Sequence, residues 1–229
     1  MTIRERLQLL FSKKNSQSEL KALSNVNLTI SKGETFGIVG RNGSGKSTLL
    51  NIIMESIRPD KGGIVKTEGK MIRLALGMGI DPNLTARENI YVNGSVIGLS
   101  FKRIGEKFDQ IIRFAALEGF VDTPVKFFSK GMKQRLLFSI AMHVETEIIL
   151  LDEFFGGVGD QDFKRKSDEA FKKVIMEGRT IIIVSHSLPI IAKYCKRVAW
   201  IHHGRVRALG PAETVLKSYR NHFKKTKAK

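Results

Sequence analysis

Residues 40–48 read GRNGSGKST, and this stretch decides the fold. It matches the pattern G-x-x-x-x-G-K-[ST] in full. It lies between an apolar run, TFGIVG (35–40), and a helix-patterned run, KSTLLNIIMESI (46–57), which Pro59 is expected to end. Glycines let the chain curl so that successive N–H groups point inward, and a helix start adds free N–H donors and partial positive charge. The pattern therefore predicts a strand, a phosphate-binding loop and a helix, in that order.

We expect this phosphate loop to hold the phosphates of ATP. Lys46 would reach the β- and γ-phosphates, Ser47 would place its hydroxyl on Mg²⁺, and Thr48 lies beside it. An ordinary glycine-rich turn is the alternative, and the agreement of strand, loop and helix disfavours it. The expected ATP-binding residues are Gly40, Arg41, Asn42, Gly43, Ser44, Gly45, Lys46, Ser47 and Thr48.

Two further apolar strands end in residues that suit the same chemistry. IILLDEFF (148–155) carries Asp152 and Glu153 to its carboxyl end, where sheets of α/β proteins hold ligands. Asp152 would hold Mg²⁺, and Glu153 would polarise a water for attack on the γ-phosphate. Strands often end in acidic residues, so the pair gains its weight from the phosphate loop. TIIIVSHS (180–187) ends in His186, which is either structural or, as we favour, a contact to the γ-phosphate.

Strand-like and helix-like patterns alternate along most of the chain, which indicates an α/β fold with a mainly parallel sheet. The stretch 85–144 is helix-patterned throughout and interrupts that alternation, so we expect it to be a subdomain. The other expected elements are a half-buried strand at 21–30, short strands in 62–76, strands at 147–152 and 180–185 separated by a helix at 161–177, a hairpin at 198–210 and a closing helix at 211–223.

Composition and charge narrow the class of protein. The chain has 229 residues, is 42% hydrophobic and carries a formal net charge of +17, which favours anionic partners. No apolar run approaches the ~20 residues needed to cross a bilayer, and the N-terminus lacks the apolar core of a signal peptide. One cysteine, Cys195, excludes an internal disulfide. The basic segment 217–229 holds six basic and no acidic residues; it is either a frayed, solvated tail or a contact for anionic lipid.

FSKGM (128–132) precedes the Asp-Glu strand and is followed by the helix-patterned KQRLLFSIAMHV. Together with the phosphate loop and the two strands, this segment resembles the ATPase subunits of ABC transporters, which carry a signature near LSGGQ at this place. The resemblance implies that Ser129, Lys130, Gly131 and Met132 act on ATP held by a second copy of the chain. It also implies that Asp160, in GVGD, lies at the seam between the two copies.

The resemblance covers nearly the whole chain and implies an ABC ATPase core of the P-loop NTPase type. Such a fold has a mainly parallel sheet, an antiparallel β portion and an inserted helical subdomain. We expect one nucleotide-binding domain over residues 1–229, with the core at about 20–84 and 145–229 and the helical subdomain at about 85–144. In the family, two ATP molecules join two copies, and Glu153, His186 and Lys46 match its catalytic positions.

One branch of the family is especially similar, namely the ATPases that export O-antigen, capsule or teichoic acid. The matching segments are GRNGSGKSTLL, LGMGIDPNLTARENIYVNG, SKGMKQRLLF, VGDQDFKRK and VSH. The resemblance implies export of a lipid-linked polysaccharide with a separate transmembrane permease, from the cytoplasmic face of the cytoplasmic membrane. The permease is expected to contact residues 76–100, with Met78, Ile80 and Leu84 as lining; a local core under a loop is the alternative. No nucleic-acid partner is expected.

Four positions depart from the wider family. Leu76 stands near the place of a usual glutamine, and Lys130 replaces a glycine and faces either a phosphate or, as we favour, solvent. The aromatic residue that stacks on adenine is not identifiable, and Phe11 is a weak candidate. The chain is also expected to lack the C-terminal carbohydrate-binding domain of longer O-antigen relatives.

Two other classes of function are compatible with an ABC ATPase. One acts on nucleic acid or ribosomes, which the positive charge permits, but such proteins usually join two cassettes or carry a coiled-coil insertion. The other is a different ABC importer or drug exporter, which TARENIYVNG and SKGM disfavour.

Overall fold

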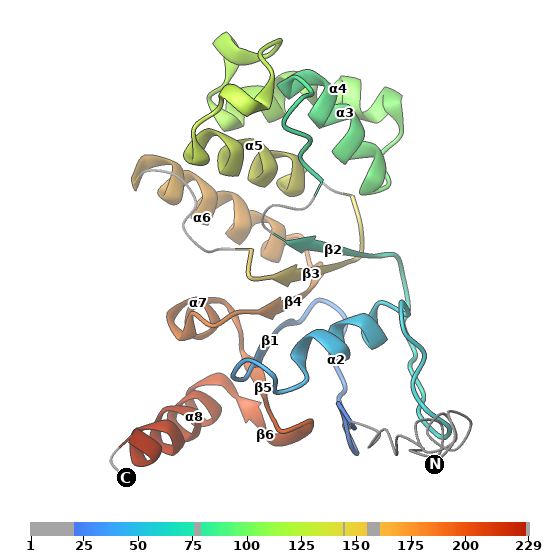
Figure 1. Ribbon diagram of the computed structural model, residues 1–229, viewed down its shortest axis with the longest axis vertical. Helices are drawn as coiled ribbons and strands as arrows, with labels where there is room; N and C mark the ends of the chain where they lie inside the picture. The colour runs from blue at the N-terminus through green and yellow to red at the C-terminus, as the bar shows by residue number, and fades with distance from the viewer. Residues whose placement is uncertain (1–20, 76–78, 144, 155–160, 228–229) are drawn as a thin grey trace, which may run out of the picture.

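The computed structural model describes residues 21–75, 79–143, 145–154 and 161–227, and within them one twisted sheet organises the chain (Figure 1). Its strands lie in the order β2-β3-β4-β1-β5-β6; every neighbouring pair is parallel except β5 with β6, which is antiparallel. The mainly parallel α/β sheet and the hairpin are therefore confirmed. The strands are β1 (Thr35–Val39), β2 (Met71–Ala75), β3 (Ile148–Asp152), β4 (Thr180–Val184), β5 (Arg197–His202) and β6 (Arg205–Pro211).

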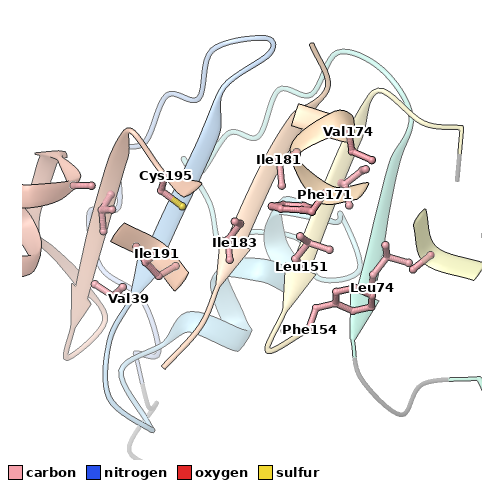
Figure 2. Close-up of a cluster of buried hydrophobic side chains, with 14 of the residues drawn as sticks. Val39, Leu74, Leu151, Phe154, Phe171, Val174, Ile181, Ile183, Ile191 and Cys195 are labelled. Carbon is pink, nitrogen blue, oxygen red and sulfur yellow. The ribbon is translucent and has the colours of Figure 1, made fainter. Parts of the chain in front are cut away.

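Helices cover both faces of this sheet, as buried parallel strands require. On one face, Leu49 and Leu50 of α2 (Lys46–Ile53) pack against Ile38 and its neighbours. The other face carries α6 (Gln161–Met176), α7 (Leu188–Tyr194) and α8 (Ala212–Lys227). Figure 2 shows side chains of this second face, where Phe171 and Ile191 lie beside residues of β1, β3 and β4.

A third group of helices forms its own layer beyond β2, at the top of Figure 1. It consists of α3 (Ala86–Val96), α4 (Phe101–Ala115), the 3-10 turns Glu118–Phe120 and Val125–Phe127, and α5 (Lys130–Met142). These helices enclose a separate buried cluster that includes Ile90, Ile104 and Leu136. Helix α5 links the two cores, because its Leu136 belongs to this cluster while its Phe138 belongs to the sheet core, where the Phe138 ring stacks on Phe154 with centroids 5.4 Å apart. Among the described residues, no helix is long and apolar enough to span a membrane.

Three expectations from the sequence are wrong in detail. Residues 21–30 form no strand, although Leu23 and Val26 do pack against the α2-side core; Asn25 has a φ of 52°, which breaks the extended run. The described residues of 62–75 form one strand, β2, which begins only after Gly62 and Gly69, since both glycines have positive φ angles that interrupt an extended run. Helix α2 ends at Ile53, before Pro59.

The closing helix is longer than expected and changes the interpretation of the basic segment. Helix α8 continues to Lys227, so most of residues 217–229 is helical. Its N-terminal part packs on the sheet through Val215 and Leu216, which are buried. The interpretation of this segment as a frayed tail is therefore wrong up to Lys227.

A substitution at Gly37 in β1 tests how closely α7 packs on the sheet. A Cβ at this position would lie 2.9 Å from Ile191 Cγ2, 3.0 Å from Val198 Cγ2 and 3.1 Å from Cys195 Sγ. We expect Gly37→Ala to lower the free energy of unfolding by about 1–3 kcal/mol, because these contacts lie in a close-packed core. Urea unfolding measures the change.

The matched control is Gly119→Ala, since a Cβ there would meet nothing within 4 Å. It should change the free energy of unfolding by less than about 0.5 kcal/mol. Equal stability of the Gly37→Ala variant and the wild type would contradict the expected loss, because it would show that α7 can shift to admit the methyl group without loss of stability.

Candidate functional site

The register of three parallel strands brings the predicted site residues to one edge of the sheet. Val184 is paired with Ile38 of β1 on one side and with Asp152 of β3 on the other. The residues that follow each strand therefore emerge together. These are the phosphate loop after β1, Glu153 after β3 and His186 after β4.

The phosphate loop turns into α2 with its backbone donors free of side-chain caps. Gly45 takes the N-cap position with φ 102°, and the first turn of α2 contains no acidic residue. Lys46 is buried, and its Nζ donates to the carbonyl oxygens of Gly40 (2.8 Å) and Arg41 (3.0 Å). Burial lowers the pKa of Lys46, and the carboxylates of Glu153 and Asp152 act in the opposite direction. The backbone carbonyls of Gly40 and Arg41 thus hold the ammonium group of Lys46 inside the loop, where it can bind an anion such as a phosphate.

The turn between β5 and β6 supports this loop from outside, which the sequence analysis missed. The N–H of Gly204 donates to the carbonyl of Ser44 (2.9 Å), and the carbonyl of Gly204 accepts from the N–H of Ser24 (2.8 Å). A Cβ on Gly204 would lie 2.5 Å from the carbonyl oxygen of Ala22. Glycine at 204 therefore allows three separate segments to meet behind the phosphate loop.

Glu153 and His186 are in direct contact, because their strands β3 and β4 are neighbours in the sheet. The N–H of His186 donates to Glu153 Oε1 (3.0 Å), and His186 Nε2 lies 3.3 Å from the same oxygen. Glu153 has a φ of 51°, an uncommon value for a residue with a side chain. Both side chains are about half exposed, at 44% for Glu153 and 51% for His186. The carboxylate is therefore fixed in direction and open to solvent.

Asp152 has a partner that the sequence analysis did not identify. Its Oδ2 forms an ion pair with Nη2 of Arg73, and Nη1 of Arg73 donates to Asn51 Oδ1 (3.1 Å). Arg73 stands in β2 and Asn51 in α2, so three elements meet at this carboxylate. The available sequence signal was a charged residue inside the otherwise apolar strand MIRLA.

The residues at this edge fit a nucleotide phosphate and a magnesium ion. Ser44 Oγ is buried without a hydrogen-bond partner among the described residues, and the first N–H groups of α2 have no intrahelical acceptor. Anions suit such a helix start. The hydroxyl of Ser47 and the carboxylate of Asp152 are oxygen donors of the type that Mg²⁺ takes, together with phosphate oxygens and water.

A cavity of about 450 Å³ opens beside the phosphate loop. Its walls combine cationic or titratable groups with aromatic rings, and Arg41 lies over the ring of Phe223 at 5.3 Å. Burial lowers the pKa of His202 in this wall, with further lowering from His203 and the neighbouring arginines. The cavity is lined by residues 41–44 of the loop, His186, His202, His203, Tyr219 and Phe223.

Comparison with known families agrees with this geometry. The family model described as ABC transporter matches residues 23–156. The chain belongs to the ABC transporter family. The teichoic acids export ATP-binding protein TagH of Enterococcus faecalis is 42% identical over 226 residues, which cover 96% of this chain and 50% of that protein. The O-antigen export system ATP-binding protein RfbB of Klebsiella pneumoniae is 40% identical over 200 residues, or 87% of this chain and 80% of that protein.

This ABC family chain spans about half to three fifths of the length of the first curated relatives it matches. Solved structures agree in fold. An ATP-binding subunit of an ABC transporter superposes with a TM-score of 0.71 at 24% identity, covering 86% of this chain and 87% of that one. A dimeric ATP-binding cassette in a post-hydrolysis state, bound to ADP and Pi, gives a TM-score of 0.67 at 26% identity, covering 83% and 90%.

The segment predicted to be the signature, residues 129–132, lies at the start of helix α5. Ser129 is the N-cap, and its Oγ accepts from the N–H of Met132 (3.2 Å), as expected for a capping serine. Ser129 and Lys130 are exposed. A Cβ on Gly131 would meet nothing closer than Ser129 Oγ at 3.9 Å, so no contact within this chain demands a glycine there.

The polar side chains of the segment TARENIYVNG cap helix α3 and hold the loop before it in this ABC chain. Thr85 and Glu88 form a capping box at the start of α3. The fully buried Asn89 donates to the carbonyls of Asp81 and Thr85 and accepts from the N–H of Asp81. Asn93 donates to the carbonyl of Gly79 (2.9 Å). Two asparagines therefore bind residues 79–85 to α3.

Two of the residues expected to contact the permease, Ile80 and Leu84, are among the described residues of this ABC fold. Ile80 is partly buried against the core of the helical layer, which agrees with the interpretation as a local core under a loop. Leu84 is half-buried. Four sequence-predicted positions lie outside the described residues: Phe11, Leu76, Met78 and Asp160.

The contribution of Ser129 as a helix cap can be measured as a change in the free energy of unfolding, separately from any role of Ser129 in ATP hydrolysis. We expect Ser129→Ala to lower the free energy of unfolding by about 1 kcal/mol, because the N–H of Met132 loses its acceptor. Ser129→Asp should stay close to wild type, since aspartate is an equally good N-cap and its charge suits a helix start. Chemical denaturation of the three proteins decides. A loss in Ser129→Asp as large as in Ser129→Ala would contradict the capping interpretation.

Proposed function

We propose that this chain is the ATP-hydrolysing subunit of an ABC transporter that exports a lipid-linked polysaccharide across the cytoplasmic membrane. The observation that carries the proposal is the meeting of Lys46, Glu153 and His186 at one edge of the sheet. Relatives named for teichoic acid and O-antigen export, which are 40–43% identical, supply the substrate class. O-antigen, capsule and teichoic acid all belong to that class.

In this proposal the residues of one copy bind ATP and prepare a water. The N–H groups of residues 43–48 and the ammonium of Lys46 hold the β- and γ-phosphates. Glu153 accepts a hydrogen bond from the attacking water, and its orientation is fixed by the N–H of His186. His186 contacts the γ-phosphate. Magnesium, held by Ser47 and Asp152, supplies charge neutralisation of the phosphate oxygens when bound.

The second half of each site comes from another copy of the chain. Figure 1 places α5 in the helical layer and α2 beyond β2, β3 and β4, so the signature segment lies away from the phosphate loop of its own chain. An exposed N-cap serine followed by an unhindered glycine suits an anion approaching from outside. We assign that anion as the γ-phosphate held by the partner copy, with Asp160 at the seam.

The proposed permease contacts the surface around α3. Val92 and Val96 lie one turn apart on this helix, with exposed fractions of 45% and 77%. An apolar face of this size suits a short helix of a membrane subunit. Binding there would place the chain peripherally at the cytoplasmic face of the membrane, and the basic helix α8 is proposed to contact anionic lipid.

The substrate class is tested by reconstitution with the membrane subunit in vesicles. We expect the ATPase rate to rise several-fold when a polyprenyl-linked glycan is present, because the substrate favours closure of the two copies. The control is the Glu153→Gln variant, which should bind ATP and show no stimulated hydrolysis. A rate that responds to other solutes and not to the lipid-linked glycan would contradict the polysaccharide assignment.

A further inference from the structure

Arg73 is a charged residue that the proposed mechanism does not use. It stands in the strand MIRLA, between apolar neighbours, with 27% of its side chain exposed. Two of its nitrogens are engaged, by Asp152 Oδ2 and Asn51 Oδ1, while its Nε is buried without a partner among the described residues. The unpaired Nε costs free energy of folding that the ion pair with Asp152 offsets only in part, so this arginine is a candidate for a role beyond stability.

The guanidinium contacts a carboxylate that is proposed to bind magnesium. Asp152 is the carboxylate assigned to the metal, and Arg73 already forms an ion pair with it. Asn51, the other partner, is four residues after Ser47 and therefore on the same face of α2. Arg73 thus reaches from β2 to one proposed metal-binding residue, Asp152, and to α2 one turn beyond the other, Ser47.

We propose that Arg73 competes with magnesium for Asp152 and so sets the metal concentration at which the chain binds nucleotide. This inference rests on the proposed function, in which Asp152 and Ser47 hold Mg²⁺. Arg73 acts through Asp152 and is a positioning residue, since it contacts neither substrate nor reacting atoms.

The chemistry of the two cations explains the competition. Mg²⁺ requires a near-octahedral shell of oxygens and usually keeps several waters. A guanidinium has five N–H donors and no acceptor, so it cannot serve as a ligand or accept from metal-bound water. Its positive charge also raises the free energy of a nearby divalent cation. Asn51 holds the guanidinium near Asp152, so Arg73 must release the carboxylate as the metal binds.

The positive charges around Asp152 also weaken its attraction for Mg²⁺ while Arg73 is in place. Lys46 is a second cation near this carboxylate, since Asp152 and Glu153 both act on its pKa. With Arg73 paired to it, Asp152 is already neutralised before any metal arrives. Removing the arginine leaves a carboxylate with a stronger attraction for Mg²⁺.

The test measures Mg²⁺-dependent binding of a fluorescent ATP analogue to the full chain. We expect Arg73→Met to lower the Mg²⁺ concentration at half-saturation by on the order of tenfold, because the competing charge is gone. Arg73→Lys keeps a charge but loses the planar fork, so it should fall between Arg73→Met and wild type. Arg58→Met removes the same charge from an exposed position beyond α2 and should leave the midpoint unchanged.

A second measurement uses thermal unfolding. In EDTA, the Tm of Arg73→Met should lie below that of wild type, because Asp152 has lost its partner. Mg²⁺ with nucleotide should then raise the Tm of this variant by more than that of wild type. If Arg73→Met does not fold, Asn51→Ala frees the guanidinium with a smaller change and should shift the Mg²⁺ midpoint in the same direction by about threefold.

The outcomes separate the two claims. An Arg73→Met variant with an unchanged or higher Mg²⁺ midpoint, beside a wild type that does require Mg²⁺, would overturn the competition alone. A wild type that binds the nucleotide analogue with no dependence on Mg²⁺ would overturn both the competition and the metal-dependent function on which it rests.

Discussion

The parallel register of β1, β4 and β3 is the constraint on which the candidate site depends. Because Val184 is paired with Ile38 and with Asp152, the three strands end at one level. The phosphate loop, Glu153 and His186 are therefore neighbours without any specific contact having to bring them together. A shift of one residue in either pairing would move each side chain of the shifted strand to the opposite face of the sheet and separate Glu153 from His186. The same strand register therefore determines both the packing of the sheet and the geometry of the site.

Opposed charges at this edge are arranged to receive an anion and a cation. Lys46 is buried within the loop and bonded to backbone carbonyls, while Asp152 and Glu153 lie close enough to act on its pKa. Arg73 completes the arrangement from β2. These groups can meet phosphate and metal with little rearrangement of the backbone, which is the advantage of a preorganised site. In the proposed pair of copies, the exposed segment at Ser129 of one copy would cover the phosphate held by the other.

The sequence was sufficient where a function depends on local chemistry. Residues 40–48, Asp152 with Glu153, and His186 each follow from a strand and the turn after it, so a single stretch contains the information. Arg73 with Asp152 could not be found in this way, because the two are 79 residues apart and meet only through strand pairing. Gly204 supports Ser44 by the same kind of distant contact. The strand wrongly predicted at 21–30 shows the converse: alternation predicts which side chains are buried, whereas a strand also needs an extended backbone, which Asn25 interrupts with a φ of 52°.

The most direct test of the two-copy site mixes two inactive variants. Lys46→Ala has a defective phosphate loop and an intact signature segment, and Ser129→Asp has the reverse. In a head-to-tail pair of one copy of each, the intact loop of one faces the intact signature of the other. The account predicts that mixing restores ATPase activity that neither variant shows alone. Two folded variants that associate with each other but show no activity in any mixture would contradict it.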